Sequence, residues 1–282
     1  MQVRRAVVAG QFYPSDIMEL RDAIEDCFVH RLGPGKLPPS NYTTEGNVIC
    51  IAPHAGYQYS GPVAANTYMH VSSLKKPETA VIVGPNHYGI GSGISSYKNG
   101  VWETPLGRVK VDRELVESIS EKTGILDFDE QAHKYEHSIE VQIPFIQYLY
   151  GNSIKIVPIC IAFQDIETAK ILGKGIAEAI RGKSCILVAS SDLTHYEEDE
   201  SARKKDRELL KAVEKLDIDL FYTSLHRLNV TACGYGAIGA SIVAARELGF
   251  VRGEILKYAT SGDITQDLSS VVGYPSVRFV KP

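Results

Sequence analysis

The sequence has no surplus of positive charge and no long hydrophobic run. Its 282 residues include 30 Lys and Arg against 34 Asp and Glu, which gives a formal net charge of −4. General nucleic-acid binders carry a basic surplus that neutralises phosphates, so we expect no nucleic-acid partner. No apolar run approaches the roughly 20 residues that cross a bilayer, and the apolar stretch at 6–9 is too short for a signal peptide. We therefore expect a cytoplasmic protein with no membrane partner.

Paired cysteines are also missing. The five cysteines are scattered and never form a Cys-x-x-Cys motif, so we expect neither a disulfide framework nor a structural zinc knuckle. Cys50, Cys160 and Cys185 each lie inside an apolar run, where a free thiol packs as a small hydrophobic side chain. These three thiols are predicted to be buried and inert.

Short β-branched runs alternate with stretches of helical spacing along most of the chain. The runs are continuously apolar, which is typical of strands covered on both faces. This pattern predicts an α/β fold with a mostly parallel central sheet flanked by helices, as a single domain over residues 1–282. Strands are predicted at 48–52, 79–83, 154–161 and 185–189, helices at 16–30, 137–149, 166–180, 202–216 and 236–248, and hairpins at 101–111 and between 255–261 and 271–280.

Polar residues follow three of these strands at the point where each strand ends. His54 follows the first run, His87 follows the second, and Asp192 and His195 follow the fourth. In open α/β sheets, ligands bind beyond the carboxyl ends of the strands. Nearby Gly and Pro residues let the loops approach a small ligand closely. We therefore predict a ligand-binding crevice at one edge of the sheet.

His54 and His87 are separated by about one strand–helix–strand unit. If their strands are neighbours, two neutral imidazoles converge on one cleft, which suits a transition metal such as iron, zinc or copper. Considered one at a time, each of these histidines is instead interpreted as a structural loop residue that is held by hydrogen bonds. Tyr57 and Asn86 lie in the same two segments and are predicted to bind the substrate.

The remaining polar clusters each have two interpretations. Asp192 is close enough in the chain to orient the ring of His195, or it caps the next helix. His137 lies in the polar segment 136–140, which is predicted to open a helix, and it belongs either to the site or to a capping arrangement. His133 is predicted to lie on a loop surface.

Cys233 differs from the other cysteines because glycines follow it and a small-residue helix then begins. A thiol ahead of a helix N-terminus has a lowered pKa, so the thiolate is favoured. A thiolate there serves as a nucleophile or a metal ligand. The alternative is a small residue chosen for tight packing beside Gly234.

Six motifs, spread in order over almost the whole chain, resemble those of the Memo family. They are Ala-Gly-Gln-Phe-Tyr-Pro at 9–14, Ala-Pro-His-Ala-Gly-Tyr at 52–57, Gly-Pro-Asn-His at 84–87, Glu-His-Ser-Ile-Glu at 136–140, Ser-Ser-Asp-x-x-His at 190–195 and Cys-Gly-x-x-x-Ile-Gly at 233–239. This family is similar to the class III extradiol dioxygenases, which are non-haem Fe(II) enzymes. The resemblance implies an α/β core with a metal pocket.

By this resemblance His54 and His87 match the two histidine ligands of the dioxygenases, and His195 matches their acid/base histidine. Cys233 falls where those enzymes place a glutamate ligand. A soft thiolate shifts the metal preference away from that of a site with two histidines and one carboxylate. Cleavage of a catechol ring therefore does not follow from the resemblance.

Three functions remain open at this point. The first is a metal-dependent redox enzyme in which His54, His87 and Cys233 hold Fe(II) or a copper ion, while Asp192, His195 and His137 line the substrate side. The second is a non-catalytic module that binds a peptide, a phospho-ligand or another small molecule in the same crevice. The third is a metal-free hydrolase with a cysteine nucleophile. The sequence does not indicate the substrate or the oligomeric state.

Overall fold

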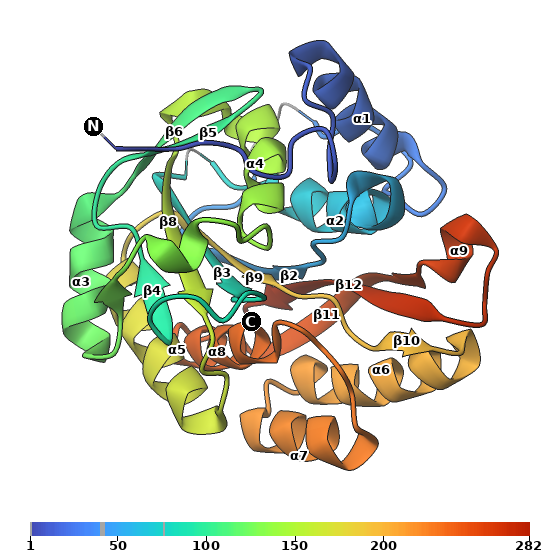
Figure 1. The fold of residues 1–282 in the computed structure, drawn as a ribbon. Coiled ribbons are helices and arrows are strands. Elements are labelled where there is room, and N and C mark those ends of the chain that lie inside the picture. The colour runs from blue at the N-terminus through green and yellow to red at the C-terminus, as the bar shows by residue number, and fades with distance from the viewer. Residues whose placement is uncertain (1, 40–42, 76) are drawn as a thin grey trace.

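The computed structural model describes residues 2–39, 43–75 and 77–282 (Figure 1). At its centre four parallel strands lie side by side in the order β8, β3, β9, β2. Almost every residue of these strands is buried, as their continuously apolar sequences predict. Their bounds are Lys155–Ile161 for β8, Thr79–Pro85 for β3, Cys185–Ser190 for β9 and Val48–Ala52 for β2.

Both edges of this parallel core are extended by other strands. On the β2 side, β12 runs antiparallel and pairs in turn with β11 and β10. On the β8 side, β6 runs parallel and continues through β5 to β1, while β4 and β7 form a short branch. These strands are β1 (Val3–Arg4), β4 (Ile94–Ser96), β5 (Val101–Thr104), β6 (Gly107–Val111), β7 (Asp127–Phe128), β10 (His195–Glu197), β11 (Arg252–Thr260) and β12 (Val271–Val280).

Helices cover both faces of the sheet. Figure 1 shows α1, α2 and α4 on one face and α5 and α8 on the other, with α6 beside β11 and β12 and α7 packed against α6. The helices are α1 (Ile17–Val29), α2 (Tyr57–Val71), α3 (Arg113–Thr123), α4 (Ile143–Tyr150), α5 (Ile166–Ile180), α6 (Asp199–Glu214), α7 (Ile218–Leu228), α8 (Tyr235–Glu247) and α9 (Gly262–Thr265). Among the described residues, no helix is long and apolar enough to cross a membrane.

The predicted α/β architecture is confirmed, with differences in its detail. The four predicted core strands and both hairpins are present, and α5 has the predicted bounds. The helix predicted at 137–149 is wrong at its start, because α4 begins only at Ile143, after one 3₁₀ turn at Glu140–Gln142. Pro144 fits this later start, since proline lacks the N–H that a first helical turn leaves unpaired. Helices α2, α3 and α7 were not predicted.

Candidate metal centre

The predicted site residues from three strand ends meet at one edge of the sheet. β9 lies between β2 and β3, so the two histidine-bearing strands are not direct neighbours but both flank β9. β9 therefore ends between the two strands that precede His54 and His87. The two imidazole rings nevertheless come close, with centroids 5.3 Å apart and planes at 82°. The parallel direction of all three strands brings their carboxyl ends together.

Cys233 joins the two histidines from the segment that precedes α8. One ligand atom each from His54, His87 and Cys233 lies within 4.8 Å of the others. The thiol sulfur is 3.1 Å from Nε2 of His54. A Cβ on Gly234 would lie 2.3 Å from the Ser190 carbonyl oxygen, so only glycine lets this segment pack against the end of β9.

A chain of hydrogen bonds from the core determines the tautomer of His54. The Tyr68 hydroxyl donates to Oε1 of Gln142 (2.6 Å), which leaves the amide nitrogen of Gln142 as a donor. That nitrogen donates to Oγ of Ser190 (2.8 Å). Ser190 gives its own proton to the Ser138 carbonyl (2.6 Å). Oγ of Ser190 therefore has only a lone pair to offer Nδ1 of His54, which is 2.9 Å away.

Both histidines consequently carry their proton on Nδ1. His54 donates from Nδ1 to Ser190, and His87 donates from Nδ1 to Oε1 of Glu136 (2.9 Å), because an ionised carboxylate only accepts. In a neutral ring with this tautomer, Nε2 is the nitrogen that faces outward as a possible metal ligand. Glu136 also accepts from the backbone N–H of His87 (2.6 Å). Although burial opposes it, the hydrogen bond from His87 lowers the pKa of Glu136 to about 2.

The Ser190 contact yields a test of this tautomer. Ser190→Ala removes the acceptor, so we expect the His54 proton to redistribute between the two ring nitrogens in the metal-free protein. Loss of a hydrogen-bond partner that orients a metal-binding histidine weakens metal binding by about 10–100-fold. Nitrogen-15 NMR of histidine-labelled protein reports the tautomer, and titration reports the affinity. Ser241→Ala, a buried serine that bonds only within α8, is the control. An unchanged His54 tautomer in Ser190→Ala would refute the assignment.

The electrostatics at Cys233 differ from the sequence-based expectation. Its position ahead of α8 predicted a lowered thiol pKa, but burial and the nearby Asp192 carboxyl raise the pKa of Cys233. Burial together with the neighbouring imidazoles holds the pKa of His54 well below its usual value. Without a cation, the two side chains therefore pair as a neutral thiol and a neutral imidazole.

Asp192 and His195 lie in the same crevice but hold different partners. The Asp192 carboxylate accepts from the backbone N–H of His54 (2.8 Å) rather than orienting the ring of His195. It does not cap a helix either, because β10 follows and Glu198 is the N-cap of α6. Burial raises the pKa of Asp192 to about 6. The His195 ring donates from Nδ1 to the carbonyls of Leu193 (2.6 Å) and Thr231 (2.9 Å).

His137 lies against the crevice with its ring parallel to that of His87. The two centroids are 4.6 Å apart at 19°, and Phe12 packs on His137 at the same centroid distance. Burial lowers the pKa of His137 to about 4. His133 is not on the surface as predicted, because it is fully buried between Trp102 and Tyr97.

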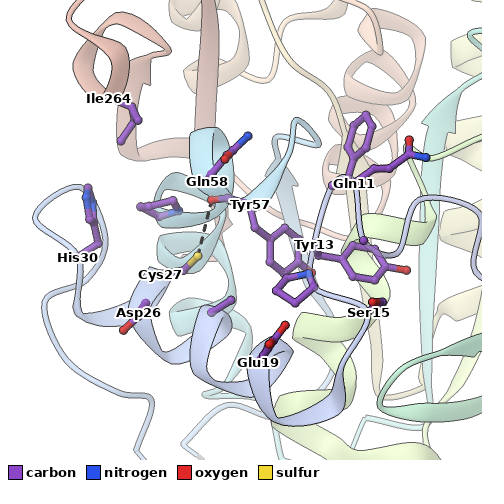
Figure 2. Close-up of a pocket in the computed structure, with 15 residues that line it drawn as sticks. Gln11, Tyr13, Ser15, Glu19, Asp26, Cys27, His30, Tyr57, Gln58 and Ile264 are labelled. Atoms are coloured by element: carbon purple, nitrogen blue, oxygen red, sulfur yellow. Dashed lines mark hydrogen bonds between the residues drawn. The ribbon is translucent and has the colours of Figure 1, made fainter.

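The structure places Tyr57 and Asn86 away from this crevice. The Tyr57 hydroxyl donates to the Val141 carbonyl (2.7 Å) in the core, and Tyr57 lines a separate groove of about 620 Å³ between α1 and α2 (Figure 2). Asn86 shapes its own loop, because its side chain accepts from the backbone N–H of Tyr88 and Gly89 and donates to Ile90. Neither Tyr57 nor Asn86 belongs to the candidate ligand cluster of His54, His87 and Cys233 or to the described lining of its crevice.

The crevice itself is a cavity of about 450 Å³. It combines a floor of histidines, carboxyl and thiol with a few apolar side chains, and its described lining contains no Lys or Arg. The lining residues are Phe12, His54, Ala55, His87, His137, Asp192, His195, Tyr196, Thr231, Cys233 and Val272.

Comparisons with known proteins cover almost the full chain. The family model for Memo-like proteins matches residues 4–278. A MEMO1 family protein of Methanopyrus kandleri is 47% identical over 98% of each chain, and one of Nitrosopumilus maritimus is 44% identical over 99% of this chain and 100% of its own. An uncharacterised Escherichia coli K12 protein of solved structure is 15% identical with a TM-score of 0.49, over 82% of this chain and 98% of its own. The chain belongs to the Memo-like protein family.

Proposed function

We propose that this protein is a metal-dependent redox enzyme that binds one first-row metal ion, Fe(II) or copper, through His54, His87 and Cys233. The observation that carries the proposal is the convergence of three metal-binding side chains, with ligand atoms within 4.8 Å of one another, at the floor of a cavity. Three protein ligands leave at least one coordination position open, whereas structural zinc takes four.

The donor set fits such an ion. Two imidazoles with unprotonated Nε2 atoms suit iron and copper, and a thiolate adds a soft ligand that favours copper. When bound, the ion supplies Lewis-acid or redox chemistry to a ligand in the cavity. His195 is the candidate to take or give a proton, because carbonyls hold its Nδ1 proton and leave Nε2 as the nitrogen for proton exchange. Asp192 fixes the His54 backbone, and His137 flanks His87.

A cysteine hydrolase is the second candidate, because the Cys233 sulfur lies 3.1 Å from Nε2 of His54. That reaction needs a thiolate. Burial raises the thiol pKa and lowers the imidazole pKa, and both shifts oppose a thiolate–imidazolium pair. A bound cation reverses this balance by stabilising the thiolate directly. The contact therefore supports a metal ligand better than a metal-free nucleophile.

A phospho-ligand module is less well supported. Recognition of phosphate relies on Arg or Lys side chains, and the described lining of the cavity has neither.

Anaerobic titration of the chelator-treated protein with Fe(II), copper and zinc tests the proposal. We expect one ion per chain with Fe(II) or copper, and a large loss of affinity in His54→Ala and His87→Ala. His226→Ala is the matched control, because His226 is exposed on α7. Wild-type binding no stronger than that of His54→Ala would overturn the metal site, and thiol-dependent activity that resists chelators would then favour the hydrolase.

A further inference from the structure

Tyr196, in the short strand β10, has a backbone conformation that bulky residues rarely adopt. Its φ is 59°, in the left-handed region. Among the described non-glycine residues only Leu216, Asn229 and Gln266 also have positive φ, and each of these lies at the end of a helix, where a left-handed residue is common. Tyr196 has no such role.

The pairing of β10 with β12 shows the origin of this conformation. His195 pairs with Val272 and Glu197 pairs with Val271, so Tyr196 is the extra residue of a β-bulge. Bulges occur next to active sites, where they redirect a side chain. Tyr196 is one of the residues that line the cavity.

The residues on either side of Tyr196 are firmly held, while its ring is not. The His195 N–H donates to Oγ1 of Thr231 (2.7 Å), and the Glu197 carboxylate accepts from Lys205 (2.7 Å) and Ser201 (2.8 Å). Tyr196 is 79% exposed, and its hydroxyl makes no hydrogen bond within the described part of the chain, although its ring meets that of His195 at an edge, with centroids 5.7 Å apart. A strained and exposed aromatic residue contributes little to folding, so its position points to a ligand.

We propose that Tyr196, together with Phe12 and Val272, forms an apolar wall that binds a planar ring of the ligand, while the ligand's polar head reaches the metal. This inference rests on the function proposed above. The cavity has the two parts that such a ligand needs, because histidines, a carboxyl and a thiol line it together with apolar side chains that include these three. An aromatic ring with a free face stacks on flat rings. The absence of Lys and Arg from the described lining favours a ligand whose ring portion is uncharged.

Two hydroxamates test this wall in the metal-loaded full-length protein. Acetohydroxamate and benzohydroxamate share one chelating head and differ in the ring. We expect benzohydroxamate to bind more tightly and Tyr196→Asn to reduce this preference by about fivefold, the value of one aromatic contact. Asn tolerates the left-handed conformation, so the melting temperature should not fall. Tyr196→Phe should keep the preference, as should the control Phe128→Asn, whose exposed ring lies on β7 outside the cavity.

The outcomes separate the two proposals. If acetohydroxamate does not bind the metal-loaded protein, the proposal of a metal ion with an open coordination position is wrong. The proposed ring subsite is then wrong as well. If acetohydroxamate binds but the ring preference is absent or survives in Tyr196→Asn, only the subsite is overturned. A lower melting temperature in Tyr196→Asn, with the preference intact, would show that the ring serves packing instead.

Discussion

Replacing Cys233 with alanine is expected to weaken Cu(I) binding by more than about 100-fold, which exceeds the usual loss when only a hydrogen-bond partner of a ligand is removed. The reason is that the thiolate is the soft donor among the three candidate ligands, and soft donors select Cu(I). Cys233→Asp supplies a carboxylate instead, so it should recover Fe(II) binding better than Cu(I) binding. Competition against a Cu(I) chelator and anaerobic Fe(II) titration measure the two affinities.

Cys27→Ala is the matched control for this experiment. Cys27 is a buried thiol in the groove between α1 and α2, away from the histidines. It should leave both affinities unchanged. Equal Cu(I) affinity in Cys233→Ala and Cys27→Ala would exclude the thiolate as a ligand.

Arg4→Met is expected to lower the free energy of unfolding by about 3–5 kcal/mol, the cost of breaking a buried ion pair. Arg4 and Glu140 are both buried and form an ion pair. Glu140 also accepts from the Tyr13 hydroxyl (2.6 Å), and Arg4 donates to the Glu136 carbonyl (2.6 Å). Without the guanidinium, the Glu140 carboxylate remains buried without its counter-charge. Urea denaturation at neutral pH measures the loss.

Arg252→Met is the control for Arg4→Met. Arg252 pairs with Glu254 at the surface, with 59% of the Arg252 side chain exposed. Exposed pairs of this kind contribute about 0–1 kcal/mol. A loss of under 1 kcal/mol in Arg4→Met as well would mean that the buried pair does not hold the N-terminal strand to the segment that carries Glu136 and His137.

The fold could be predicted from the sequence where the apolar pattern of a segment matches the burial of that segment. The core strands are buried on both faces, and their continuous apolar runs indicate this directly. Helix α2 was missed because it is buried nearly all round, so it lacks the one-sided apolar stripe of a surface helix, and it contains Gly61 and Pro62. Helix α3 did carry usable signals, with Asp112 as its N-cap and Gly124 in the left-handed conformation at its C-terminus.

For the candidate site, the sequence could predict which residues come together but not the contacts that orient them. Parallel strands that end at one sheet edge bring their following residues together, which is why His54 and His87 could be paired from the chain alone. The contacts that orient these rings could not be read in that way. Gln142 reaches Ser190 from a 3₁₀ turn far away in the chain, and no pattern marks a partner that tertiary packing supplies. The position of Tyr57 in the groove between α1 and α2 could not be predicted either, because its motif gives proximity in the chain but not the direction of α2.

The distribution of the three candidate ligands along the chain has a consequence for biosynthesis. His54 and His87 leave the ribosome early, but Cys233 follows only after β9, and β12, which flanks β2, is made last. A nascent chain that stops short of residue 233 therefore offers an incomplete ligand set. Sheets joined by such distant segments also form slowly, since long loops must close first. If the proposed metal site is correct, the complete ligand set is available only after the segment that carries Cys233 has been made.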